Sequence, residues 1–208
     1  MVDHLLRRPK EQVLMPVARR VGAHLHPTTL TLLAFGFGLA AAVCLWRGAM
    51  TAGFILWLLN RLVDGLDGTV ARATNTQSDW GGYLDMLLDT VVYAMIPLAL
   101  VLHDPAATLW LALALLLVSF YINSISWAYL AAVLEKRAAG AKAQGELTSV
   151  TMPTGLIEGT ETVLFFSAFI LFPTALVWLF GLMAALVAVN IAQRLIWAGR
   201  NLRMERPQ

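Results

Sequence analysis

The stretch DGLDGTVARATNTQSDWGGYLDMLLD, residues 64–89, decides how the rest of the chain is interpreted. It concentrates carboxylates in a chain of 208 residues that is 59% hydrophobic and only 13% charged. An ordinary soluble domain has about 25% charged residues, so the composition predicts a membrane protein. Apolar sequence flanks the stretch on both sides, and we therefore expect its charges to lie at the edge of a membrane.

Apolar runs of about the length that a bilayer requires occur six times. A transmembrane helix needs about 20 apolar residues, and the runs cover residues 28–48, 50–66, 84–103, 106–134, 154–172 and 174–196. None has the strict alternation of barrel strands, and helices satisfy their own backbone hydrogen bonds in lipid. We expect an all-α integral membrane protein with six transmembrane helices, forming one domain over residues 1–208. The bundle would occupy residues 28–196, and residues 197–208 would be a cytosolic tail.

The first 27 residues allow two interpretations. They contain five Lys and Arg residues and lack the long apolar core of a signal peptide. One interpretation is a basic tail. The other, which we expect, is an interfacial amphipathic helix, with Val17 and Val21 facing acyl chains and the arginines facing anionic lipid headgroups.

The positions of the basic residues predict the orientation. With a cytosolic N-terminus, all of the 15 Lys and Arg residues except Arg47 fall on the inner side of the membrane. Both termini and the 64–89 stretch would then be cytosolic, in a multi-pass protein of the cell (inner) membrane. Topology accounts for the basic residues, so no nucleic-acid partner is expected. Cys44 is the only cysteine, which excludes a disulfide or thiolate metal site within the chain.

The carboxylates of the stretch are spaced as pairs. Asp64 and Asp67 are three residues apart, and Asp85 and Asp89 are four apart, so each pair shares one face of a helix. Carboxylates that converge near a membrane are costly unless a cation sits among them. Arg72 alone would be one charge against four. Ligation by oxygen only favours a hard divalent cation, Mg²⁺ or Mn²⁺, with positions left open for water and a substrate phosphate.

The glycines and the arginine of the stretch each have two interpretations. Gly68 and Gly81 could let a ligand approach the backbone closely, or could be ordinary packing glycines of membrane helices. Arg72 could extend to the membrane interface, or could bind a pyrophosphate beside the metal.

These residues together form a known pattern. Asp67-Gly68-x2-Ala71-Arg72-x8-Gly81-x3-Asp85-x3-Asp89, preceded by Asp64, resembles the signature of the CDP-alcohol phosphotransferase family in residue type and spacing. The resemblance implies an integral membrane enzyme, commonly a homodimer. Such an enzyme cleaves the pyrophosphate of a CDP-linked donor, releases CMP and joins the remaining phosphoryl group to an alcohol.

The resemblance also implies roles for individual residues. Asp64, Asp67, Asp85 and Asp89 would bind one or two divalent metal ions, with Asp89 also the general base. The nucleotide part of the donor site would be formed by residues of the same motif, namely Gly68, Ala71, Arg72 and Gly81. At the start of the first helix, Thr28 stands where many family members carry Asn, so the nucleotide contact from that end stays open.

The donor has two alternatives. CDP-diacylglycerol could give its phosphatidyl group to a small polar alcohol, or CDP-choline or CDP-ethanolamine could give its phospho-base to diacylglycerol. The compact chain resembles bacterial enzymes of the first kind, which we expect.

The acceptor is indicated only indirectly. Residues 71–81 are similar to phosphatidylserine synthases, and residues 84–89 to phosphatidylinositol synthases. Arg137 and Lys142 could hold an acceptor phosphate, or could simply mark the cytosolic side. Glu158 and Glu161 could form an acceptor pocket that disfavours a second phosphate, or could be polar residues near a helix start. Serine is expected ahead of inositol or glycerol 3-phosphate.

Two further classes of protein compete with an enzyme. Intramembrane carboxylates can mark the path of a divalent-cation transporter, but the outer halves of these helices are almost wholly apolar. A catalytically silent scaffold would be expected to have lost part of the motif, and none of its residues is lost.

Overall fold

The computed structural model describes residues 15–137, 157 and 159–202. Within these ranges the chain forms helices and no strand, which confirms the expected all-α class. The helices are α2 (Pro27–Trp46), α3 (Met50–Ala73), α4 (Asp79–His103), α5 (Ala107–Lys136), α7 (Gly159–Leu171), the short 3-10 helix η1 (Pro173–Ala175) and α8 (Leu176–Asn201).

The helices follow the apolar runs closely, with one difference at the 64–89 stretch. The apolar runs end at residue 66 and resume at residue 84, with the aspartate pairs expected on helices. The structure instead continues α3 to Ala73 and begins α4 at Asp79, so the turn is short and the motif residues are helical. Between Met50 and Ala73 there is no proline to stop the helix, and charged side chains are tolerated where the helix leaves apolar surroundings.

Local signals define the turn between α3 and α4. Asn75 has a positive φ of 54°, a conformation that Asn tolerates better than most residues and that ends a helix. Ser78 is the N-cap of α4, and its hydroxyl accepts a hydrogen bond of 3.1 Å from the backbone N–H of Gly81. Asp79 in the first turn is favourable beside the helix dipole.

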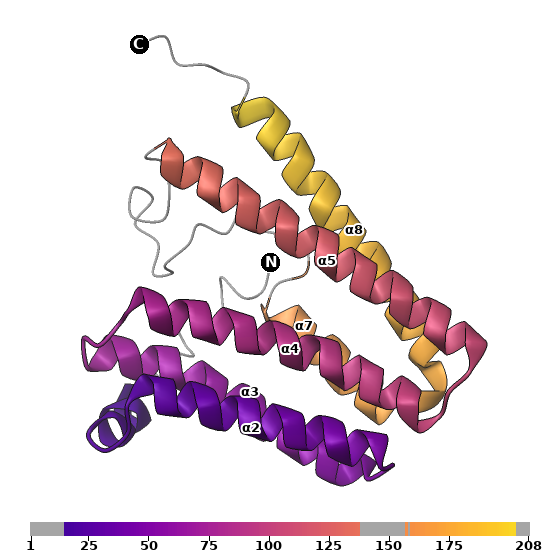
Figure 1. Cartoon of the computed structure of the whole chain (residues 1–208), viewed down its shortest axis with the longest axis horizontal. Helices are drawn as coiled ribbons and strands as arrows, with labels where there is room; N and C mark the ends of the chain where they lie inside the picture. Colours follow the sequence, from indigo (N-terminus) through magenta and orange to yellow (C-terminus); the bar gives the residue numbers. More distant parts are fainter. Residues whose placement is uncertain (1–14, 138–156, 158, 203–208) are drawn as a thin grey trace.

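The helices form two packed groups (Figure 1). Helix α2 packs against both α3 and α4, and α5 packs along α8. Helix α7 contacts α3 and α4 in the first group and α8 in the second. An aromatic cluster joins them: Phe166 of α7 stacks on Trp57 at 5.3 Å and meets Tyr93 edge-on at 5.1 Å, while Phe169 meets Phe180 of α8 at 4.8 Å.

A glycine allows α2 to approach α3 and α4 closely. A Cβ atom on Gly38 would lie 2.5 Å from a methyl carbon of Val92 and 3.1 Å from the amide nitrogen of Asn60. The side-chain amide of Asn60 donates to the carbonyl of Ala34 at 2.8 Å, which satisfies this buried polar group. Gly38 and Asn60 therefore set the spacing of the three helices that contain the site.

Four helical segments in the described part of the chain are long and apolar enough to cross a membrane. They are α2, α4, α5 and the continuous segment Pro173–Asn201. Helix α3 has 24 residues but carries charged residues in its second half, and α7 is apolar with 13 residues. The structure thus supports a membrane protein, and six spans remain a prediction.

Residues 15–22 are helical and pack against α2 and α3. Ala18 is fully buried in a small cluster with Leu30 and Val70, and Val21 packs against it. Val21 is half-buried and contacts protein, whereas Val17 is exposed. The position of this helix in a headgroup layer remains a prediction.

Candidate active site

Three aspartates from two helices meet beside the turn between α3 and α4. Asp64 and Asp67 come from α3 and Asp85 from α4, and one carboxylate oxygen of each lies within 4.8 Å of the others. We call these three residues the aspartate cluster. The three-residue spacing on α3 places its two members on one face, and the packing of α4 brings Asp85 opposite them.

Helix α2 supports the cluster from a third side. The hydroxyl of Thr31 donates a hydrogen bond of 2.7 Å to a carboxylate oxygen of Asp67. Both residues are buried, so this bond replaces water that the carboxylate has lost. A neutral donor orients Asp67 without neutralising it.

Asp89, the fourth aspartate of the motif, is bound by an arginine. Arg61 of α3 donates from one terminal nitrogen to Asp89 Oδ1 at 2.6 Å and from the other to Oδ2 at 3.2 Å. The same guanidinium lies 3.5 Å from Asp64. Asp89 thus lies beside the aspartate cluster, lines one small pocket with Asp64 and Asp85, and pairs with Arg61.

The guanidinium of Arg61 is held on its other sides as well. It donates to the side-chain carbonyl of Asn60 at 2.7 Å and to the hydroxyl of Tyr93 at 2.8 Å. It lies 5.0 Å from the ring centres of both Trp57 and Tyr93, within the range of a cation–π interaction. Only 9% of the Arg61 side chain is exposed, so its position is well defined by contacts.

The donor set of the cluster fits a hard divalent cation. It contains carboxylate oxygens only, which suits Mg²⁺ or Mn²⁺ and not zinc or copper. The three carboxylates are mostly withdrawn from water and would repel one another strongly. Binding of a divalent cation would relieve this repulsion, while Arg61 is already engaged with Asp89.

The other motif residues line the end of α3 and the start of α4. A Cβ atom on Gly68 would lie 3.4 Å from a terminal nitrogen of Arg72, so the arginine side chain lies along the glycine. Arg72 also donates to the hydroxyl of Thr69 at 3.4 Å. Ala71 is half-buried on the same helix, and Gly81 lies in the first turn of α4. Their roles toward a nucleotide remain predictions.

The residues considered for the acceptor are only partly described. Lys142 and Glu158 lie outside the described residues. Arg137 follows α5, and its guanidinium donates to the carbonyl of Leu202 beyond α8 at 3.0 Å. Glu161 is half-buried in the first turn of α7. An acceptor role for any of these four residues remains a prediction.

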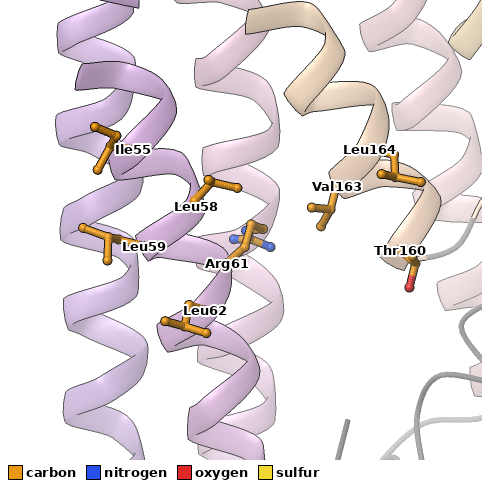
Figure 2. A pocket seen from close by; sticks show the side chains of 8 residues that line it. All are labelled: Ile55, Leu58, Leu59, Arg61, Leu62, Thr160, Val163 and Leu164. Carbon is orange, nitrogen blue, oxygen red and sulfur yellow. The ribbon is translucent and has the colours of Figure 1, made fainter. Parts of the chain in front are cut away.

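A groove opens between α3 and α7 beside Arg61. Its α3 side consists of leucine and isoleucine, and its α7 side of Val163, Leu164 and, at the start of the helix, Thr160. Figure 2 shows Arg61 among the residues of the α3 side, and Thr160, Val163 and Leu164 on the α7 side. The groove thus connects an apolar surface to the charged centre of the site.

Several residues of the site were not predicted from the sequence. Arg61 was counted only as a marker of membrane orientation, and Thr31, Asn60 and Tyr93 were not considered. For Arg61 a signal existed: it lies three residues before Asp64, on the same helix face, inside an otherwise apolar run. Asn60 precedes Arg61 on the same helix, whereas Thr31 and Tyr93 reach the site through the arrangement of α2 and α4 beside α3, which no spacing in the sequence reveals.

Comparison with known sequences gives a family match over most of the chain. A sequence model of the family described as CDP-alcohol phosphatidyltransferase matches residues 24–194. The inner membrane protein YnjF of Escherichia coli K12 is 35% identical over 173 residues, covering 83% of this chain and 82% of that protein. The CDP-diacylglycerol–serine O-phosphatidyltransferase of Mycobacterium tuberculosis H37Rv is 34% identical over 92 residues, covering 44% of this chain and 32% of that protein.

Comparison with solved structures gives the same architecture. Phosphatidylinositol phosphate synthase of Mycobacterium tuberculosis with CDP-DAG bound has a TM-score of 0.70 at 22% identity, covering 95% of this chain and 100% of that chain. The same enzyme in complex with manganese and citrate has a TM-score of 0.68 at 23% identity, covering 93% of each chain. At this identity the likeness shows a shared fold.

Proposed function

The chain belongs to the CDP-alcohol phosphatidyltransferase family, and from this premise we propose that it transfers the phosphatidyl group of CDP-diacylglycerol to a small polar alcohol and releases CMP. The observation that carries the proposal is the convergence of Asp64, Asp67 and Asp85 from two helices, with Asp89 one turn beyond them. A solved structure of the same fold with CDP-DAG bound supports this donor.

The aspartate cluster would hold one or two Mg²⁺ or Mn²⁺ ions, as the manganese complex of the structural neighbour supports. A bound ion would neutralise negative charge on the donor pyrophosphate. Arg72, lying along Gly68, would pair with the phosphate that leaves with CMP. Ala71 and Gly81 would line the nucleotide beside it, where small residues leave room.

The remaining chemistry is a displacement at phosphorus. The acceptor hydroxyl oxygen attacks the phosphorus that carries diacylglycerol, and a new P–O bond forms as the bond to the bridging oxygen breaks. CMP leaves with that electron pair. Asp89 takes the proton of the attacking hydroxyl as general base. Both oxygens of Asp89 contact Arg61, and each keeps a second lone pair that can accept this proton.

Among acceptors we propose serine first, ahead of inositol and glycerol 3-phosphate. The similarity of residues 71–81 to phosphatidylserine synthases supports this order, as does the match to a serine phosphatidyltransferase over part of the chain. The protein would act in the inner membrane as a homodimer with its site on the cytosolic side, where a lipid donor and a soluble acceptor can meet.

The test is an assay of CMP release. Purified protein is incubated with Mn²⁺ and CDP-diacylglycerol, and serine, inositol, glycerol 3-phosphate and inositol phosphate are offered separately. Release with serine above all others is the expected result. Release of CMP with another acceptor above serine would support the proposed reaction and would replace serine as the proposed acceptor. Absence of CMP with every acceptor, and also with CDP-choline plus diacylglycerol, would overturn the proposed function.

Glu161 offers a test of the acceptor pocket. If its carboxylate binds the acceptor, Glu161→Gln should raise the KM for the acceptor several-fold and leave the KM for CDP-diacylglycerol unchanged. Steady-state kinetics with each substrate varied in turn would measure both. Equal effects on the two constants would assign Glu161 a structural role.

A further inference from the structure

The face of α8 that packs into the bundle changes from apolar to polar partway along the helix. Its first buried side chains recur at the spacing of a packed helix, and they are Leu176, Phe180, Met183 and Val187. The next buried position on this face is Asn190, whose side chain is only 3% exposed. A buried amide among apolar side chains is costly unless its polar atoms are hydrogen-bonded, so the partners of Asn190 indicate why it is there.

Asn190 makes two hydrogen bonds to the backbone of one residue, Ile157. The amide nitrogen of Asn190 donates to the carbonyl of Ile157 at 2.8 Å, and its side-chain oxygen accepts from the backbone N–H of Ile157 at 3.2 Å. Ile157 lies two residues before Gly159, where α7 begins, so its N–H and C=O need partners outside that helix. A single side-chain amide satisfies both groups, because it carries a donor and an acceptor.

This backbone attachment lies next to the candidate active site. Thr160, three residues after Ile157, lines the groove between α3 and α7 together with Arg61 (Figure 2). Glu161 belongs to the same first turn of α7. The side chain of Ile157 itself packs against the main hydrophobic core. The position of the first turn of α7 at the edge of the site therefore depends on how Ile157 is held.

Helix α7 has a second attachment farther along, to α3. The indole N–H of Trp57 donates to the hydroxyl of Ser167 at 3.2 Å, and the ring of Trp57 stacks on Phe166 at 5.3 Å. These contacts do not involve α8 and would remain if the amide of Asn190 were lost. Removal of the amide should therefore loosen the start of α7 and leave the rest of the helix in place.

We propose that Asn190 is a positioning residue that fixes the start of α7 at the edge of the site and so sets the fit of the acceptor alcohol. This inference rests on the proposed function, in which the acceptor binds at Glu161 and the donor at the aspartate cluster and Arg72. The donor residues lie on α3 and α4, which Asn190 does not hold. Loss of the Asn190 amide should therefore weaken the binding of the acceptor and spare that of the donor.

The first measurement is steady-state kinetics of CMP release by Asn190→Leu. Leucine is close to asparagine in size and suits the apolar face of α8, but it leaves the N–H and C=O of Ile157 without the amide. With the acceptor that gives the fastest CMP release, its KM should rise at least about fivefold, and the KM for CDP-diacylglycerol should change less than about twofold.

The second measurement follows the start of α7 without any substrate. In a Cys44→Ser background, Thr160→Cys places a thiol at a half-buried position in the first turn of α7. In detergent, a water-soluble maleimide should label this thiol at least about threefold faster once Asn190→Leu is added, because the turn opens more often. Gln77→Cys, in the exposed turn between α3 and α4, should be labelled at the same rate with and without Asn190→Leu.

Two further variants serve as controls. Asn201→Leu is the matched control, because Asn201 is exposed and its amide donates to the carbonyl of Trp197 on the same helix, at 2.8 Å. It should change neither the KM values nor the labelling rate. Asn190→Gln keeps an amide but places it one methylene farther from α8, so both measurements should shift in the same direction by less. This variant provides the test if Asn190→Leu does not fold.

Two results would overturn the inference. One is an unchanged labelling rate of Thr160→Cys in the Asn190 variants. The other is an equal change in the two KM values, or a fall in kcat alone, which would limit Asn190 to the packing of the helices. Labelling requires no substrate, so a wild-type protein that releases no CMP would contradict the proposed function, while the labelling rate would still decide whether Asn190 fixes the start of α7.

Discussion

Neighbouring aspartates of one helix have different partners in this protein. Asp85 faces the carboxylates of Asp64 and Asp67, while Asp89 faces Arg61. The family resemblance implied a general base at Asp89 and metal binding at all four aspartates, but the spacing could not show their partners, because it reports only which side of a helix a residue occupies. Their partners differ because Arg61, Asp64 and Asp67 follow one another at three-residue spacing along α3, and α4 places Asp89 beside Arg61 and Asp85 beside the two acids.

At this scale the first prediction concerns the general base. Asp89→Asn keeps the size of the side chain and can still accept a hydrogen bond from Arg61, but it cannot take a proton. We expect turnover to fall by roughly 10²–10⁴-fold, with binding of CDP-diacylglycerol retained. CMP release and nucleotide binding would measure the two effects.

The matched control for this variant is Asp79→Asn. Asp79 lies on the same helix but is exposed in its first turn, so its substitution should leave turnover nearly unchanged. Unaltered turnover in Asp89→Asn itself would remove Asp89 as the base.

The second prediction concerns the support of the cluster by α2. Thr31→Val keeps the shape of the side chain and removes the donor to Asp67, leaving a buried carboxylate with a lost hydrogen bond. The free energy of unfolding should fall by about 1–3 kcal/mol, as measured by denaturation in detergent. Thr29→Val, at an exposed position of the same helix, should have little effect. Equal effects of the two variants would contradict the role given to Thr31.

Among the elements, α2 acts as the reference against which α3 and α4 are placed. It approaches both closely at Gly38 and bonds to α3 through Asn60 and Thr31. The extents of the helices were predicted well, because long apolar runs, the N-cap Ser78 and Asn75 in the turn are local signals. The paired spacing of the aspartates predicted that both helices continue into the charged motif, but their ends were not predicted, because the apolar runs end before the helices do.

The third prediction tests this close approach. Gly38→Ala would place a methyl group 2.5 Å from Val92, forcing α2 away from α4. Overpacking of this kind costs about 1–3 kcal/mol, and the shift should also weaken Mn²⁺ binding by displacing Thr31 from Asp67. Thermal unfolding and metal titration would measure the two effects.

Gly36 provides the control on the same helix. Nothing lies within 4 Å of a Cβ atom there, so Gly36→Ala should be neutral or slightly stabilising. A similar loss of stability in both variants would show that helix propensity and not packing is responsible.

The whole molecule consists of two helical groups joined by aromatic contacts through α7. Phe166 and Phe169 of α7 contact Trp57 and Tyr93 on one side and Phe180 on the other. The turn between α3 and α4 lies at the end of the helices that contains the site, while the α4–α5 turn lies at the opposite end (Figure 1). The distribution of basic residues predicts that the site end is cytosolic.

The fourth prediction tests this orientation. In a Cys44→Ser background, Gln77→Cys places a thiol at the exposed α3–α4 turn, and Ala106→Cys places one at the exposed opposite end. A maleimide that cannot cross membranes should label the first from the cytosolic face only and the second from the outer face only. Labelling of both from one side would contradict the predicted topology.

The sequence by itself determined the helical class, the positions of the apolar segments, the family and the identity of the acidic residues. These features depend on composition, on periodicity along a single helix, and on a motif whose spacing can be recognised in the sequence without the tertiary structure. The resemblance to the CDP-alcohol phosphotransferases is confirmed by the match over residues 24–194.

Only the tertiary structure decided which charges meet. It brought Thr31 to Asp67 across 36 residues and Arg61 to Asp89 across 28, and it placed Asp89 in one pocket with Asp64 and Asp85. Contacts of this kind depend on the spacing and rotation of packed helices, which here follow from a close approach at Gly38 and from the aromatic support of Arg61. Neither the close approach at Gly38 nor the aromatic contacts of Arg61 produce a periodic pattern in the sequence, because both depend on how helix surfaces meet.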